Sequence, residues 1–108
     1  MGLELSTAEA LLEDRPLKAA LLELGNAVIA LFWLGDEPRL GTLTISMPGG
    51  VSSPLLGDRD RVLSQVIAER LAHLYGKMAL VSINLPPDLE VSAGRVLLKL
   101  VGELVRER

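Results

Sequence analysis

The side chains that could carry out chemistry are few in this chain, and they lie apart from one another. There is one histidine, His73, and no cysteine, which excludes disulfides, thiol catalysis and thiolate metal sites. A metal centre or a catalytic triad needs companion residues at recognisable spacings, and His73 has none. We therefore expect His73 to be a solvent-exposed side chain on a helix and predict no metal site.

Two further segments have compositions that occur in binding sites. Asp58-Arg59-Asp60 brings two carboxylates together, but a calcium loop needs further oxygen ligands, whereas acidic residues at the start of a helix complement its dipole. The Gly-rich stretch 48–53 lacks the Gly-Lys-Ser/Thr ending of a phosphate-binding loop, so we interpret it as an ordinary connection. We expect no catalytic, cofactor-binding or metal-binding residue, and we interpret the protein as a non-enzyme.

Composition limits the chain to one domain and favours a protein that associates. The 108 residues form a single domain, 1–108, and the hydrophobic content of 49% is high for a small monomer. The net charge is −3 without a basic cluster, so we expect no nucleic acid partner. The longest uncharged stretch, 24–35, is shorter than the roughly 20 residues that cross a membrane. With no basic region at the N-terminus, we expect a cytoplasmic protein and no membrane partner.

The charged and amide residues show a bias in their frequencies. The sequence has one Gln, two Asn and eight Arg against three Lys. Few thermolabile residues favour a thermophilic source, although a genome of high GC content would produce much of the same bias.

Residues 27–34 carry the clearest structural signal in the chain. All eight side chains are apolar, and a strand directs alternate side chains to its two faces. Both faces should therefore leave water, but the chain offers only two confident helices, enough to cover one face of a sheet. We expect a second copy of the chain to cover the other face, as a homodimer or a dimer of dimers. The sequence does not choose that face, so the interface candidates come from both: Ile29, Leu31, Trp33 and Phe32.

The segment 6–24 supports two interpretations. Ser6-Thr7-Ala8-Glu9 resembles a capping box followed by good helix formers. Pro16, however, would break such a helix, and Asp14-Arg15-Pro16 could be a turn between two strands. Local signals leave helix and hairpin open.

The remaining elements have clearer patterns. Residues 27–47 are predicted as a β-hairpin that turns at Gly35-Asp36-Glu37-Pro38, and 48–57 as a loop. A helix is predicted over 58–75, capped by Asp58 or Asp60 and ended by Gly76, then a strand from 78 to 85. Its apolar stripe comprises Leu63, Val66, Ile67, Leu71 and Leu74. A last helix is predicted over 92–106, capped by Ser92, with an inner face of Ala93, Leu97, Leu100, Val101 and Leu104.

Three short motifs occur in a distinctive order along these elements. Leu40-Gly41-Thr42-Leu43 lies in a strand, Leu55-Leu56-Gly57 precedes the helix, and Ala79-Leu80-Val81-Ser82-Ile83 forms the next strand. In this order the chain resembles the small proteasome assembly chaperones of the third and fourth type, as an archaeal-like homologue. The resemblance implies an α+β fold of order β-β-β-β-α-β-α: an antiparallel sheet with two helices on one face and the other face used for dimerisation. It also implies two strands, 7–13 and 17–24, at the N-terminus.

The same resemblance implies a function without catalysis. Such a chaperone holds proteasome α-subunits during assembly of the α-ring. Some other assembly factors end in a hydrophobic-Tyr-any motif that enters α-ring pockets, and the end of this chain, 105–108, lacks it. We expect partner contacts on connections instead, in the loop 48–57 and at Asp36, Glu37 and Arg39.

A different class of protein is the alternative interpretation. Roadblock- or longin-like scaffolds are also small dimeric α+β domains, and they act on small GTPases. They would need an N-terminal helix and more strands after the helix 58–75, and only one strand fits between Lys77 and Pro86.

Overall fold

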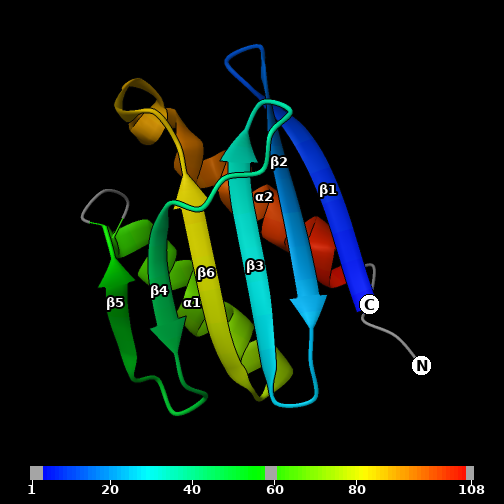
Figure 1. Cartoon of the computed structure of the whole chain (residues 1–108), viewed down its shortest axis with the longest axis vertical. Coiled ribbons are helices and arrows are strands. Elements are labelled where there is room, and N and C mark those ends of the chain that lie inside the picture. Colours follow the sequence, from blue (N-terminus) through cyan, green and yellow to red (C-terminus); the bar gives the residue numbers. More distant parts are fainter. Residues whose placement is uncertain (1–3, 58–60, 107–108) are drawn as a thin grey trace.

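The chain folds into one six-stranded sheet with both helices on the same face. The computed structural model describes residues 4–57 and 61–106. The strand order is β1-β2-β3-β6-β4-β5, and Figure 1 shows α1 and α2 behind the sheet, which leaves its other face open. The elements are β1 (Glu4–Leu12), β2 (Arg15–Glu23), β3 (Ala27–Leu34), β4 (Thr42–Ser46), β5 (Ser52–Leu56), α1 (Arg61–Tyr75), β6 (Met78–Asn84), the 3-10 helix η1 (Pro87–Leu89) and α2 (Glu90–Arg106). The α+β class and the placement of the helices are as predicted.

The N-terminal segment is a hairpin and not a helix. β1 and β2 pair antiparallel from Glu4 opposite Glu23 to Leu12 opposite Arg15. The turn consists of Glu13 and Asp14, with φ of 49° and 67°, so it lies one residue before the turn suggested by the sequence. Both residues have the left-handed backbone that a two-residue hairpin turn requires. The two strands implied by the resemblance are confirmed, but they begin three and two residues earlier than expected, and each ends one residue earlier.

The predicted hairpin over 27–47 is wrong, because β6 lies between β3 and β4. β6 pairs parallel with β3 and antiparallel with β4, so the sheet is mixed and not antiparallel as expected. Neighbouring strands are about 4.8 Å apart, and the residues 35–41 that join β3 to β4 easily pass across one intervening strand. This arrangement could not be predicted from local sequence patterns, because β6 begins more than thirty residues after the end of β4.

Part of the predicted loop 48–57 is also a strand. β5 pairs antiparallel with β4 at the edge of the sheet, with an irregularity between Leu43 and Thr44. Only the short turn before it is a loop, held by a hydrogen bond of 2.8 Å from the Met47 backbone N–H to the Val51 carbonyl. Pro54 lies within β5, and such a position is tolerated at a sheet edge, where a strand has a partner on one side only.

α1 ends as the sequence predicts but presents a different face to the sheet. Gly76 has a φ of 64°, and the backbone N–H groups of Gly76 and Lys77 both donate to the Ala72 carbonyl, at 2.9 and 3.3 Å. Val66 and Leu74, predicted for the apolar stripe, are exposed, whereas Ile67 and Leu71 are buried as expected and Leu63 is partly buried. The inner face is completed by Ser64, Ala68, Ala72 and Tyr75. Small side chains let α1 lie close to β4 and β6. The predicted caps Asp58 and Asp60 lie outside the described residues.

α2 confirms its predicted inner face. All five residues named for that face are buried, and the helix packs over β1 and β2. It begins at Glu90, directly after η1, so Ser92 lies within the helix and is not its cap. β6 begins at Met78 as predicted and ends at Asn84, one residue before the predicted end and ahead of Pro86-Pro87.

Candidate interaction surface

The structure separates the two faces of β3. Val28, Ala30 and Phe32 point toward the helices and are fully buried. Side chains alternate along a strand, so Ile29, Leu31 and Trp33 lie on the opposite, uncovered side of the sheet. Of the four interface candidates from the sequence, Phe32 therefore belongs to the core and is removed from the candidate surface. The other three share one face.

Apolar side chains continue this surface across four strands. Leu22, Ile29, Leu80 and Ile45 are register partners in one row, and Ala20, Leu31, Ser82 and Leu43 in the next. We call the surface formed by these eight residues the open face. The one polar member, Ser82, is fully buried, and its hydroxyl oxygen accepts a hydrogen bond of 2.9 Å from the Gly41 backbone N–H. The open face is thus an apolar patch without an unsatisfied polar group at its centre.

Charge is confined to one margin of this face. Glu9 and Lys18 are opposite each other on β1 and β2, and Lys18 is opposite Trp33 on β3. The Lys18 ammonium reaches Asp36 at 3.2 Å. Trp33 is 8% exposed, and its indole Nε1 is buried without an acceptor among the described residues. A shallow hollow beside it is lined by Thr7, Ala8, Glu9, Lys18, Ala19 and Trp33.

The connection 35–41 carries the predicted partner-binding residues and is anchored at both ends. The Gly35 backbone N–H donates to the Pro16 carbonyl at 2.9 Å. The Asn84 side-chain amide donates to the Leu40 carbonyl at 3.0 Å, next to the bond between Gly41 and Ser82. Asp36, Glu37 and Arg39, between these anchors, are exposed.

The three charged residues of this connection already have ionic neighbours. Arg39 contacts Glu37 at 2.7 Å, and Asp36 contacts Lys18. Ion pairs this exposed contribute about 0–1 kcal/mol, so a partner can replace them at little cost. The structure thus presents these side chains to solvent on a fixed backbone.

Two glycines explain why the sequence motifs lie where they do. A Cβ on Gly41 would lie 2.1 Å from the Ile83 carbonyl oxygen, and one on Gly57 would lie 2.7 Å from the Thr42 hydroxyl oxygen. The backbone at Gly41, just before β4, therefore lies too close to β6 for any larger residue. The backbone at Gly57, just after β5, lies equally too close to Thr42 of β4. The Gly-Thr-Leu and Leu-Leu-Gly motifs meet at this corner of the sheet. Sequence reasoning missed Ser82 and Asn84, which hold the connection from β6, because their partners lie about forty residues away in the chain.

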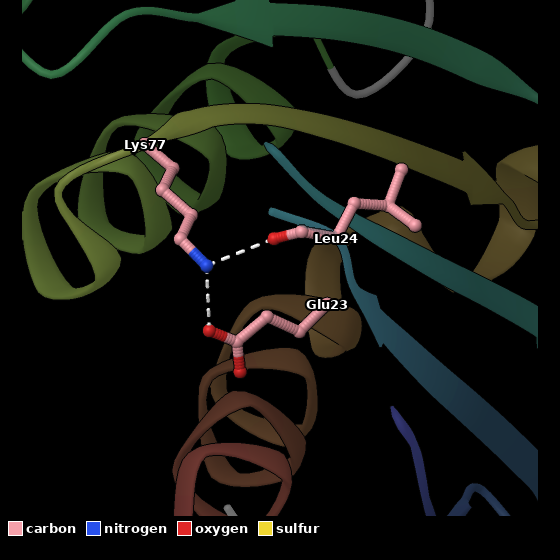
Figure 2. Close-up of polar contacts among 3 residues, drawn as sticks. All are labelled: Glu23, Leu24 and Lys77. Carbon is pink, nitrogen blue, oxygen red and sulfur yellow. Dashed lines mark hydrogen bonds and ion pairs between the residues drawn. The ribbon is translucent and has the colours of Figure 1, made fainter. Parts of the chain in front are cut away.

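A second anchor lies at the opposite end of the sheet. Figure 2 shows the Lys77 ammonium donating to the Glu23 carboxylate and to the Leu24 carbonyl, both at 2.8 Å. Lys77 follows α1 and Glu23 ends β2, so this contact joins the helix to the β2–β3 turn. The arrangement is structural: it holds the turn that leads into the start of β3, the strand that carries part of the open face.

The polar contacts of α1 link it to the neighbouring strands. The Ser52 hydroxyl donates to the Glu69 carboxylate and accepts from the Gln65 amide, both at 2.7 Å. Thr44 and Ser64 share a buried hydrogen bond of 2.7 Å. His73 is exposed, as predicted. Within residues 4–57 and 61–106, no three His, Cys, Asp or Glu side chains gather as a metal site would require. No described helix is long and apolar enough to cross a membrane.

The fold has a counterpart among solved structures. No protein-family model matches the sequence, and no curated protein matches it. A chain in the crystal structure of a chaperone complex for yeast 20S proteasome assembly superimposes with a TM-score of 0.70 and 16% identity. The match covers 95% of this chain and 96% of the yeast chain. At this identity the likeness is one of fold: the chain has the architecture of a subunit of that yeast chaperone complex.

Proposed function

We propose that this protein is a non-catalytic, dimeric chaperone that binds proteasome α-subunits during assembly of the α-ring. The observation that carries the proposal is the fold likeness to the yeast chaperone complex over nearly the whole of both chains. The motif order in the sequence, which resembles that of the small proteasome assembly chaperones, also supports the proposal. The proposal extends to the finer points of α-subunit binding, homodimerisation and a cytoplasmic location.

The open face supports the dimeric part of the proposal. It presents six large apolar side chains, Leu22, Ile29, Leu31, Leu43, Ile45 and Leu80, on the side of the sheet that the helices do not cover. Apolar surface of this kind marks a site of association, and a two-fold axis would place one open face against another. Both helix layers would then face outward.

The connection 35–41 supports the partner-binding part. Its backbone is anchored at both ends while its charged side chains are exposed. Loops held on a rigid scaffold commonly carry binding residues. Charges at Asp36, Glu37 and Arg39 would govern partner choice and association rate more than affinity.

The experiment mixes the purified protein with proteasome α-subunits from the same organism and identifies complexes by native mass spectrometry. We expect a complex that contains the chaperone dimer and an α-subunit. A variant with Asp36, Glu37 and Arg39 all changed to Ala should weaken that complex, whereas Arg70→Ala, an exposed change on α1, should not.

The competing function gives a different result in the same experiment. A GTPase scaffold of the roadblock or longin type would capture a small GTPase and no α-subunit. The hairpin found at residues 4–23 replaces the N-terminal helix that such a scaffold needs. Capture of a purified GTPase without any α-subunit complex would replace the chaperone proposal.

A further inference from the structure

The two edges of the sheet differ in their protection against a further strand. β5 has five residues, contains Pro54, and pairs irregularly with β4. Short length, proline and irregularity are the features that prevent edge pairing. β1 has nine residues, pairs with β2 without irregularity, and contains no Pro, Lys or Arg. Only the β1 edge is therefore open to another strand.

The backbone of β1 is suited to such an addition. A two-residue turn places the first hydrogen-bonded pair at its flanking residues, and bonded pairs then alternate along the hairpin. Leu12 and Arg15 flank the turn, so Leu5, Thr7, Glu9 and Leu11 direct their N–H and C=O groups away from β2. The same four side chains are exposed, with Leu5 and Leu11 at 65% and 66%.

We propose that a second copy of the chain adds to the β1 edge, with the two β1 strands antiparallel and Ala8 opposite Ala8 of the second copy. The two exposed leucines lie symmetrically about Ala8, so this register places Leu5 of each copy opposite Leu11 of the other. It also places Thr7 opposite Glu9, where the hydroxyl can donate to the carboxylate.

Neighbouring registers are less favourable. A register centred on Glu9 would place the two Glu9 carboxylates opposite each other, and like charges in that position destabilise a sheet. A register centred on Thr7 would place each Leu5 opposite a Glu9. The register centred on Ala8 avoids both and pairs outward-directed backbone positions with each other, as an antiparallel ladder requires.

This contact is independent of the proposed function and of the open face. It joins two sheets edge to edge into one continuous sheet and leaves the open faces free to meet other copies. Ala8 lies on the helix side of the sheet, against the core. Pairing through the open faces therefore keeps the two Ala8 residues apart by the thickness of both sheets.

Cysteine cross-linking tests the register directly, because the chain has no native cysteine. Opposite residues of a non-hydrogen-bonded pair have Cα atoms about 4.5 Å apart, within the range of a disulfide. Ala8→Cys should form a dimer on oxidation, seen as a doubled mass in non-reducing electrophoresis. Ala10→Cys is the matched control, since Ala10 shares strand, face and partial burial. Its two copies would be about 13 Å apart at the rise of a strand and should remain uncross-linked.

A second variant blocks strand addition at the β1 edge. Thr7→Pro deletes one outward N–H, a change that edge strands tolerate, and combined with Ala8→Cys it should abolish the cross-link, whereas Thr7→Val should keep it. In the native chain, the amides of Thr7 and Glu9 should be protected from hydrogen exchange at high concentration and lose that protection on dilution. Equal cross-linking of Ala8→Cys and Ala10→Cys, or fast exchange of both amides at every concentration, would overturn the proposal.

Discussion

At the scale of single residues, the corner where β4, β5 and β6 meet depends on the absence of a side chain. Gly41→Ala would place a methyl group 2.1 Å from the Ile83 carbonyl oxygen, a distance that forces the backbone to move. We expect this change to lower the free energy of unfolding by roughly 2 kcal/mol or more, as steric strain in a packed site does. Gly49→Ala is the control, because nothing lies within 4 Å of its added Cβ. Urea unfolding of the two variants should differ accordingly, and equal stabilities would contradict this account of the corner.

At His73, in contrast, we expect a substitution to have little effect on stability. His73 is exposed on α1, and no group of metal-ligating side chains forms around it among residues 4–57 and 61–106. His73→Ala should leave the free energy of unfolding within about 0.5 kcal/mol of the native value, as surface substitutions usually do. Chemical denaturation measures this change. A loss of α-subunit binding on this substitution alone would show that the residue has a function.

At the scale of elements, the turn of the first hairpin uses residues that are poorly suited to its backbone. Glu13 and Asp14 both have positive φ, and a left-handed conformation costs roughly 1–2 kcal/mol for residues other than Gly, less for Asn and Asp. Replacing the pair by Asn-Gly, the preferred residues of such a turn, should raise the free energy of unfolding by about 1 kcal/mol. Thermal and urea unfolding would report the gain, while a decrease would mean that Glu13 contributes contacts that outweigh its strain.

The elements also show which parts of the fold the sequence could reveal. α2 was predictable because the five apolar residues named for its inner face recur at helical spacing, and all five are buried. The face of α1 was mispredicted because small residues, Ala68 and Ala72, face the sheet while the larger Val66 and Leu74 are exposed. β6 between β3 and β4 could not be predicted from local pattern, since pairing between distant segments has no signature within either one.

The candidate surface was also only partly predictable from the sequence. Both faces of β3 are apolar, so the sequence identified the strand that carries the candidate surface but not which of its faces the helices leave uncovered. The helices decide this: they cover Phe32 and leave Leu31 uncovered. The anchors from Ser82 and Asn84 to the connection 35–41 depend on the position of β6 and became visible only with the topology.

At the scale of the whole molecule, the helices cover one face of the sheet, whereas the other face has no helix over it and is crossed at one end by the connection 35–41 (Figure 1). An apolar face of this kind should be buried against another molecule. The central claim is that a second copy fills this role and that the resulting dimer is the form that binds α-subunits. In such a dimer both helix layers would face outward.

The most direct test is the molar mass by light scattering of the native chain, Leu31→Glu and Phe32→Glu at micromolar concentration. We predict a native mass of at least twice the 11.6 kDa of one chain. Leu31→Glu should halve that mass while circular dichroism shows a folded protein, because the charge lies on the open face. Phe32→Glu should unfold the chain, because it places a charge in the core. A native protein of 11.6 kDa, or a Leu31→Glu variant with unchanged mass, would contradict the account.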